Sequence, residues 1–316
     1  MTAQPVPRQY QALRHFSAWL LAALMILPAS AQDYGDTPYV QTPQVVVDRM
    51  LEVAKVSARD FVIDLGSGDG RMVITAAQRY GARGFGVDLD RRLVTLSNRN
   101  AAKAGVGDRA VFYERDIYQT DLSRASVVTI YLLPEVNLMM RPKLFAMLKP
   151  GTRVVSHDYD MGEWPPDLTF TMDAPGKTVG RDKTSKVFYW VVPAKAAGQW
   201  RWRTAASGAQ KDFDLALNQN FQKLEGTLTV DGKSIVIEDV KLVGDVLTFA
   251  ARLDASGATR SEFNGRIVNN AIQGTLRTVR AGAAPQQFPW SAVRTEVWEP
   301  RHLTLPPPTL MPPVPQ

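Results

Sequence analysis

Cysteine is absent from the 316 residues of this sequence. Disulfide bonds and metal sites built on thiolates are therefore excluded. The only stretch that suggests a metal, His157-Asp158-Tyr159-Asp160, offers one imidazole and two carboxylates, which is too few ligands for a zinc-type site. We therefore predict no metal site and expect this stretch to close a strand and to shape the acceptor side.

A concentrated block of positive charge is also missing. The net charge is +6 and the isoelectric point is near 9.5, but the excess is spread evenly along the chain. Segments 1–31, 32–195 and 196–316 each carry a net charge of +2. This even distribution lacks the basic footprint of a nucleic-acid-binding protein, so we predict no nucleic-acid partner.

No apolar run reaches the roughly 20 residues that a membrane span requires. The run Ala18–Leu27 follows Arg8 and Arg14 and precedes Ala29-Ser30-Ala31. A basic start, a short apolar core and small residues are typical of a secretory signal cleaved after Ala31. We expect residues 1–31 to be a signal peptide and the protein to be exported to the periplasm. An uncleaved membrane anchor through residues 16–31 and a buried helix are the alternatives.

Glycine is concentrated in one place, where it takes every second position. Residues Phe61–Gly70 contain an apolar run, then Asp64, then the glycine loop, and Arg71–Tyr80 has helical spacing. Strand, glycine loop and helix together make a ligand site, because glycine allows close approach and a helix start offers free N–H groups. A dinucleotide fingerprint needs a third glycine where Arg71 stands, so the loop is G-x-G-x-G. The alternative is an ordinary tight turn.

A second acid follows the next strand. Residues Gly84–Val87 lead into Asp88, about 20 residues past the loop, where a βαβ unit places a carboxylate on ribose hydroxyls. Asp90 is expected to cap the helix that begins at Arg91. Two acids in matching places make an accidental turn a poorer explanation of the loop.

Strands and helices alternate along the first two thirds of the chain. Thr42 is expected to cap a helix that has Pro43 at its first position, and further helices are expected at 91–104 and 137–148. The predicted strands are 61–63, 85–87, 110–113, 126–131, 152–156, 167–172 and 187–192. This alternation predicts an α/β fold, a doubly wound and mostly parallel seven-stranded sheet, with ligands at the carboxyl ends of its strands.

Residues 37–193 resemble the class I (seven-β-strand) S-adenosylmethionine-dependent methyltransferases. Within that class they look like the protein-lysine methyltransferases that act on the ATP synthase c subunit and the adenine nucleotide translocase. The resemblance rests on Pro38-Tyr39-Val40 with Thr42-Pro43, on Asp64 to Arg71, on Tyr131-Leu132-Leu133-Pro134 and on Pro150 to Ser156.

The resemblance implies a Rossmann-like fold, S-adenosyl-L-methionine as cofactor and a protein lysine as acceptor. It places Asp64 or Asp69 near the cofactor amino group, Asp88 on the ribose, and Asp116 and Ile117 at the adenine, although Asp116 could simply cap a helix. The implied cofactor-binding residues are Asp64, Gly66, Ser67, Gly68, Asp69, Gly70, Asp88, Leu89, Asp116 and Ile117. The candidate catalytic residues are Tyr39, Tyr131, Pro134 through its carbonyl, and Glu135, which could equally be a solvated residue of a first helical turn.

The acceptor is less closely defined than the cofactor. The Asn-Pro-Pro-Tyr motif of enzymes that methylate DNA amino groups is absent, which counts against adenine. We expect a protein substrate, and the resemblance extends this expectation to membrane-associated proteins. A small-molecule or lipid methyltransferase, and an exported binding protein that kept the fold without turnover, are the alternatives.

The pattern changes after residue 193. We interpret 32–193 as the methyltransferase domain, 194–198 as a linker, and 199–297 as a smaller all-β meander, either a sandwich or a barrel. Short strands at regular spacing, predicted at 221–230, 234–238, 246–253, 260–268 and 271–278, favour this interpretation, as does a hairpin signal at Asp231-Gly232. Residues 298–316 are the last segment, a proline-rich tail, and Leu305–Gln316 within it are expected to be extended or disordered.

Overall fold

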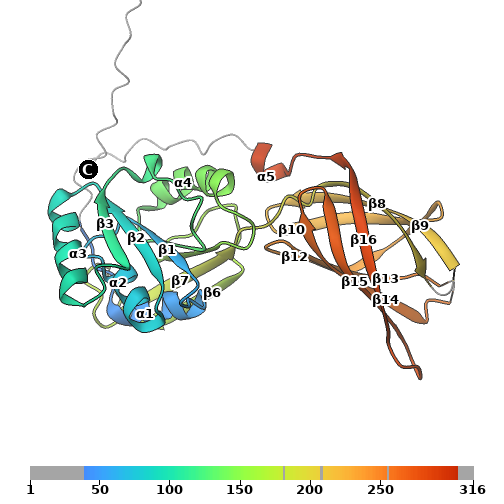
Figure 1. The fold of residues 1–316 in the computed structure, drawn as a ribbon, viewed down its shortest axis with the longest axis horizontal. Helices are drawn as coiled ribbons and strands as arrows, with labels where there is room; N and C mark the ends of the chain where they lie inside the picture. The colour runs from blue at the N-terminus through green and yellow to red at the C-terminus, as the bar shows by residue number, and fades with distance from the viewer. Residues whose placement is uncertain (1–38, 181, 207–208, 255, 305–316) are drawn as a thin grey trace, which may run out of the picture. The chain divides into compact units, whose positions relative to one another are not determined.

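The computed structural model describes residues 39–180, 182–206, 209–254 and 256–304, which form two β-sheets (Figure 1). The predicted signal peptide lies outside the described residues, as does most of the proline-rich tail. None of the described helices has the length and hydrophobicity needed to cross a membrane.

The first sheet has seven strands in the order β3-β2-β1-β4-β5-β7-β6. Strands β1 to β5 are parallel, and β6 and β7 form an antiparallel pair at one edge. The predicted doubly wound, mostly parallel sheet is therefore confirmed. Its strands are β1 (Phe61–Leu65), β2 (Arg83–Asp88), β3 (Ala110–Glu114), β4 (Val127–Ile130), β5 (Arg153–His157), β6 (Leu168–Asp173) and β7 (Thr184–Val191).

Helices cover both faces of this sheet. Neighbouring strand residues point to opposite faces, so a strand that is apolar throughout needs a helix on each side to bury its side chains. Val62 packs in one buried cluster with residues of α1 and α2, whereas Ile63 packs in another with residues of α4. The helices are α1 (Gln44–Val53), α2 (Arg71–Tyr80), α3 (Arg91–Lys103) and α4 (Pro134–Met147), with a short 3₁₀ turn η1 (Ile117–Gln119). This arrangement leaves the carboxyl ends of β1, β2 and β4 together at one edge.

Two predicted helix starts are wrong. Pro43, not Thr42, is the N-cap of α1, because the Thr42 hydroxyl lies 3.2 Å from Nδ1 of His157 and makes a tertiary contact instead. Helix α4 begins at Pro134, three residues before the predicted Asn137. Proline suits the first helical position, since its fixed φ fits a helix and its missing N–H would have no partner there.

The second sheet is entirely antiparallel and has nine strands in the order β11-β10-β9-β8-β16-β15-β14-β13-β12. Strand β12 approaches β10, so the sheet curls almost into a barrel around an aromatic core that includes Trp202, Phe263 and Trp290. The strands are β8 (Gly198–Ala206), β9 (Ala209–Asn220), β10 (Lys223–Val230), β11 (Lys233–Ile235), β12 (Ile237–Val243), β13 (Val246–Arg252), β14 (Thr259–Val268), β15 (Ala271–Arg280) and β16 (Gln286–Val297). A four-residue helix, α5 (Arg301–Thr304), follows. The predicted all-β meander is confirmed.

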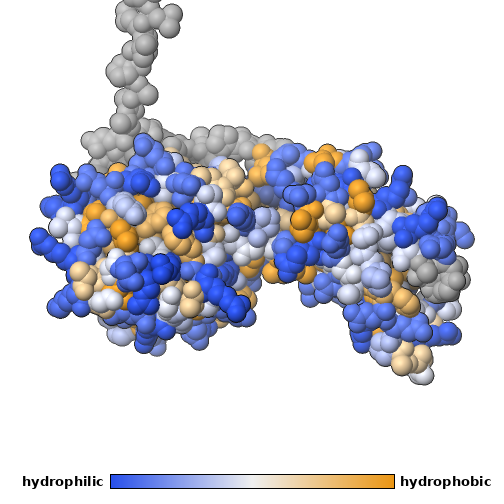
Figure 2. Space-filling model, in the orientation of Figure 1, coloured by the Kyte–Doolittle hydropathy of each residue, from blue (hydrophilic) through white to orange (hydrophobic). Residues whose placement is uncertain are grey.

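Polar side chains cover most of the visible surface, with small apolar spots between them (Figure 2). The apolar residues therefore lie mainly in the interiors described above. Buried polar side chains are fewer, and two of them, Asp64 and Ser67, lie at the end of β1 where the glycine loop begins.

Candidate active site

The glycine loop between β1 and α2 is enclosed by side chains on two sides. Gly66 and Gly68 have φ angles of 77° and 53°, which side-chain-bearing residues rarely adopt. A methyl group on Gly66 would lie 2.7 Å from Cδ2 of Leu132, and one on Gly68 would lie 2.5 Å from the ring of Tyr39. Tyr39 and Leu132 thus approach the loop backbone at distances that only glycine permits.

The loop is tied to the end of β2. The N–H groups of Gly66 and Ser67 donate to the carbonyl of Val87 at 3.0 and 2.9 Å. The N–H of Gly68 donates to Oδ2 of Asp88 at 2.9 Å, and the N–H of Asp90 donates to Oδ1 of Asp88 at 2.9 Å. Asp88 therefore shapes the loop in addition to any contact that it makes with a ligand. Asp90 caps α3, as predicted.

Asp64 lies in the interior beside the loop. The hydroxyl of Thr129 donates to its Oδ1 at 2.6 Å. Burial raises the pKa of Asp64 to about 7; the hydrogen bond from Thr129 opposes this rise, and the nearby carboxylates of Asp88 and Asp69 add to it. A cationic group that reached this carboxylate would favour its ionised form.

Asp69 and Arg71 connect the loop to the segment before α1. Nη2 of Arg71 lies 2.6 Å from Oδ2 of Asp69, and Nη1 donates to the carbonyl of Thr42 at 2.7 Å. Burial would raise the pKa of Asp69, but the hydrogen bonds and charge of Arg71 outweigh that effect, so the pKa is lowered. Asp69 therefore carries a negative charge at neutral pH beside the loop.

The loop also contains a polar atom without a partner. The hydroxyl of Ser67 is buried and makes no hydrogen bond within the described residues. Such an orphaned group is costly unless a ligand or water satisfies it. The glycine backbone, the carboxylates and this hydroxyl fit S-adenosylmethionine, whose methionine part carries an ammonium and a carboxylate.

The residues predicted at the adenine end lie at the same edge. Asp116 follows β3, and its Oδ1 accepts from the N–H of Tyr118 at 2.7 Å, so it caps η1 as the plainer interpretation proposed. Ile117 is partly buried against the apolar cluster that includes Leu122. Leu89, next to Asp88, is 72% exposed. These residues lie along the ends of β2 and β3, where a nucleoside could extend from the loop.

An aromatic group follows the ends of β4 and β5. Tyr131 directly follows β4, and its ring centroid lies 4.0 Å from that of His157. The ring of Tyr159 lies 6.3 Å from that of Tyr131, with an angle of 19° between the two planes. The sequence drew attention to Tyr131 but assigned no separate role to Tyr159.

His157 is fully buried beneath this aromatic group. Its ring nitrogens contact the hydroxyls of Thr42 at 3.2 Å and Ser185 at 2.9 Å. Burial lowers its pKa to about 4, so the imidazole is neutral at physiological pH. No group of acidic and imidazole side chains in the described part of the chain could hold a metal ion.

Pro134 and Glu135 occupy the first turn of α4 and are exposed. A carbonyl in the first helical turn points along the axis toward the N–H four residues on, so that of Pro134 is poorly placed to bind a substrate. Glu135 fits the favourable interaction between an acid and a helix start.

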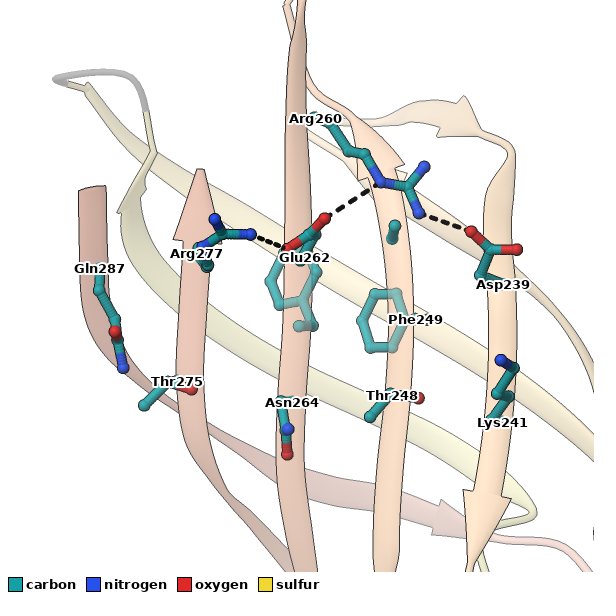
Figure 3. A pocket seen from close by; sticks show the side chains of 12 residues that line it. Asp239, Lys241, Thr248, Phe249, Arg260, Glu262, Asn264, Thr275, Arg277 and Gln287 are labelled. Carbon is teal, nitrogen blue, oxygen red and sulfur yellow. Dashed lines mark hydrogen bonds and ion pairs between the residues drawn. The ribbon is translucent and has the colours of Figure 1, made fainter. Parts of the chain in front are cut away.

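A hollow of about 460 Å³ lies on the second sheet (Figure 3). Four of its charged side chains pair with one another: Arg260 contacts Asp239 at 2.6 Å and Glu262 at 3.4 Å, and Arg277 contacts Glu262 at 2.8 Å. This cross-strand ladder accounts for these charges without a ligand.

Comparison with known proteins identifies the first sheet. Residues 64–168 match the family model of the ANTKMT methyltransferase domain. A protein-lysine N-methyltransferase of Saccharolobus islandicus is 48% identical over 130 residues, which cover 41% of this chain and 81% of the archaeal protein. The chain belongs to this methyltransferase family. The prediction of an S-adenosylmethionine-dependent methyltransferase is therefore confirmed.

Further proteins of known sequence or structure match part of the chain. The adenine nucleotide translocase lysine N-methyltransferase of Mus musculus is 32% identical over 129 residues, which cover 41% of this chain and 56% of that protein. A crystal structure of an RNA methyltransferase from Salinibacter ruber with S-adenosyl-L-homocysteine is 51% identical, covers 48% of this chain and 93% of that chain, and has a TM-score of 0.44. The chain thus spans a little over half the length of the mouse relative.

Proposed function

We propose that this protein methylates the ε-amine of lysine in a protein substrate. The observation that carries the proposal is the 48% identity with a protein-lysine N-methyltransferase over most of the length of that relative. The geometry supports the proposal. Leu132 lies against Gly66 of the glycine loop, and Leu132 directly follows Tyr131, which belongs to the aromatic group at the ends of β4 and β5. Cofactor and acceptor can therefore approach each other at one edge of the sheet.

The bound cofactor supplies a methyl group on a sulfonium sulfur, and its transfer to nitrogen forms an N–C bond as the S–C bond breaks. The protein must align the amine with that methyl group and keep water out. Tyr39 and Leu132 cover the loop and so help to keep water out. Asp64 or Asp69 faces the cofactor amino group in this proposal. Asp88, followed by Leu89, holds the ribose, and Asp116 with Ile117 borders the adenine.

The ammonium of lysine must lose a proton before it can attack. Burial raises the pKa of Tyr131 to about 12, and the charge of Asp158 contributes, so this phenol stays protonated and cannot be the base. In our proposal Tyr131 orients the amine, and the proton passes to the Glu135 carboxylate or to solvent.

The test uses the full chain with S-adenosylmethionine labelled in its methyl group. Incubation with a protein mixture, followed by mass spectrometry, should find methyl groups on lysine. Asp88→Asn should weaken cofactor binding and abolish labelling, whereas the exposed Asp108→Asn should change neither. Label in lipid or RNA but not in protein would overturn the proposal. Cofactor binding without transfer of label to any acceptor would favour a binding protein without turnover.

We also propose that the protein is exported, as its N-terminal pattern indicates. Cell fractionation and the mass of the mature N-terminus test this point. Recovery of the chain from the cytoplasm with residues 1–31 still attached would contradict it.

A further inference from the structure

Tyr159 stands on a turn that the protein holds in an unfavourable conformation. Asp158 has a φ angle of 60°, in the left-handed region that non-glycine residues seldom occupy. Its N–H donates to the carbonyl of Lys186 at 2.8 Å, and its Oδ1 accepts from the N–H of Lys186 at 2.9 Å. Its Oδ2 lies 2.8 Å from Nζ of Lys177. Strain that surrounding contacts maintain in this way often marks a functional site.

Helix α4 fixes the other side of the same turn. The buried side-chain amide of Asn137 donates to the carbonyls of Tyr159 and Asp160 at 3.2 and 3.3 Å. The hydroxyl of Ser156 donates to the carbonyl of Tyr159 at 2.6 Å. The backbone of Tyr159 is therefore held from two elements, although its side chain is 36% exposed.

The Tyr159 side chain stands nearly parallel to that of Tyr131, next to the cofactor loop. Tyr131 directly follows β4, and its neighbour Leu132 lies against Gly66 of the loop. The imidazole beneath Tyr131 is neutral because burial lowers the pKa of His157 to about 4.

On the basis of the proposed function, we infer that Tyr159 is a specificity-determining residue. With Tyr131 it forms an aromatic wall that receives the alkylammonium end of the acceptor side chain. Ring faces attract alkylammonium groups, and methylene groups of a lysine pack against them. This contact explains why hydrogen bonds from neighbouring elements hold the backbone of a partly exposed tyrosine on a strained turn. A side chain that contacted only solvent would not need a fixed backbone.

The experiment compares three peptides that differ at one position, which carries lysine, trimethyl-lysine or the uncharged norleucine. The wild-type protein with S-adenosyl-L-homocysteine should bind the trimethyl-lysine peptide about tenfold more tightly than the norleucine peptide, in the range of a partly desolvated cation–π contact. Tyr159→Leu should reduce this ratio to about twofold or less and raise KM for the lysine peptide. Tyr159→Phe should keep both values close to wild type, and none of these variants should change cofactor affinity.

Tyr113→Leu is the matched control, because Tyr113 is a comparably exposed tyrosine at the end of β3. It should leave the peptide preference intact. If Tyr159→Leu fails to fold, Tyr159→Met makes the same test with a longer apolar side chain. If the Leu or Met variant still prefers the trimethyl-lysine peptide over the norleucine peptide as strongly as the wild type does, the inference about Tyr159 is overturned. The proposed function would stand in that case, provided that the protein methylates lysine. Absence of lysine methylation in the wild type would instead refute the proposed function.

Discussion

Burial favours the protonated form of Asp64, whereas its proposed role beside a cationic ligand needs the carboxylate. A carboxyl group enclosed beside Thr129 and near two other acids has its pKa raised to about 7, so near neutral pH a large fraction is protonated. The protein alone therefore tolerates Asp64 in its uncharged form. A cationic ligand would shift it to the carboxylate.

The first prediction concerns stability against pH. The pKa of Asp64 is higher in the folded protein than in the unfolded chain, so the folded state binds more protons between about pH 4 and pH 7. The contribution of Asp64 to stability is therefore complete at low pH and is lost as the pH rises through this range. The free energy of unfolding of the wild type, relative to Asp64→Asn, should fall from pH 4 to pH 7 in urea titrations. A difference that stays constant over this range would contradict the assigned pKa shift.

Gly68 gives a second prediction at this scale. Gly68→Ala should weaken cofactor binding at least tenfold, because the new methyl group would displace Tyr39 and the backbone would remain in the left-handed region. Isothermal titration with S-adenosylmethionine measures the effect. Gly105→Ala is the control: its φ is also positive, at 70°, but its methyl group would meet no atom within 4 Å. Equal losses in both variants would show that strain alone is responsible.

Residue roles that depend on neighbours in the sequence were predictable, and those that depend on distant contacts were not. The cap at Asp90 follows from the residues just after it. The contact between Thr42 and His157 joins residues 115 positions apart, so no local pattern could anticipate it. The pairing of Tyr159 with Tyr131 was unpredictable for the same reason, since the two residues follow different strands.

At the scale of elements, one arginine fastens the segment before α1 to the glycine loop. Arg71 begins α2, pairs with Asp69 and donates to the carbonyl of Thr42. Thr42 in turn contacts His157 beneath the aromatic wall. Segment 39–43 therefore connects the loop with the acceptor side.

The third prediction tests this connection. Arg71→Gln should lower cofactor affinity about tenfold and expose segment 39–43 to limited proteolysis, because a hydrogen-bonded charge pair next to the loop is lost. The control is Arg79→Gln at the other end of α2, where Arg79 forms a more exposed ion pair with Asp48. That variant should bind the cofactor normally. If both variants behave like wild type, Arg71 does not anchor the segment.

The strands of the first sheet were predictable because each is a short apolar run followed by an acid or a turn. Strands β8, β9 and β16 were not predicted. The first two carry a regular alternation, seen at Trp200 and Trp202 and again at Phe213 and Leu215, which a search for period two would have found. Strand β16 contains Pro289, which cannot donate to a neighbouring strand and so argues against a strand interior.

At the scale of the whole molecule, each sheet has its own aromatic or aliphatic core. The rings of Trp202, Phe213, Phe249 and Trp290 surround Phe263 within the second sheet. The family match covers residues 64–168 and so lies entirely within the first. The change from a mixed to an antiparallel sheet near residue 193 could be predicted from the sequence pattern, whereas the near-closure of the second sheet depends on the approach of β12 to β10.

The fourth prediction separates the two sheets. Phe263→Ala should lower the free energy of unfolding by about 3–5 kcal/mol, because it removes a fully buried ring. Cofactor affinity should stay within about twofold of wild type at temperatures where the variant is folded. Phe288→Ala, on the partly exposed side of β16, should cost much less stability. A large loss of cofactor affinity in Phe263→Ala would mean that the second sheet supports the binding site.

The hydrogen bond from Gly68 to Asp88 has a consequence for how fast a ligand can associate. Asp88 holds the backbone of the turn through a contact within the protein, so the entropy of ordering the turn is lost during folding and not during binding. Encounter, and not a slow rearrangement of the turn, should then limit how quickly the nucleoside is captured.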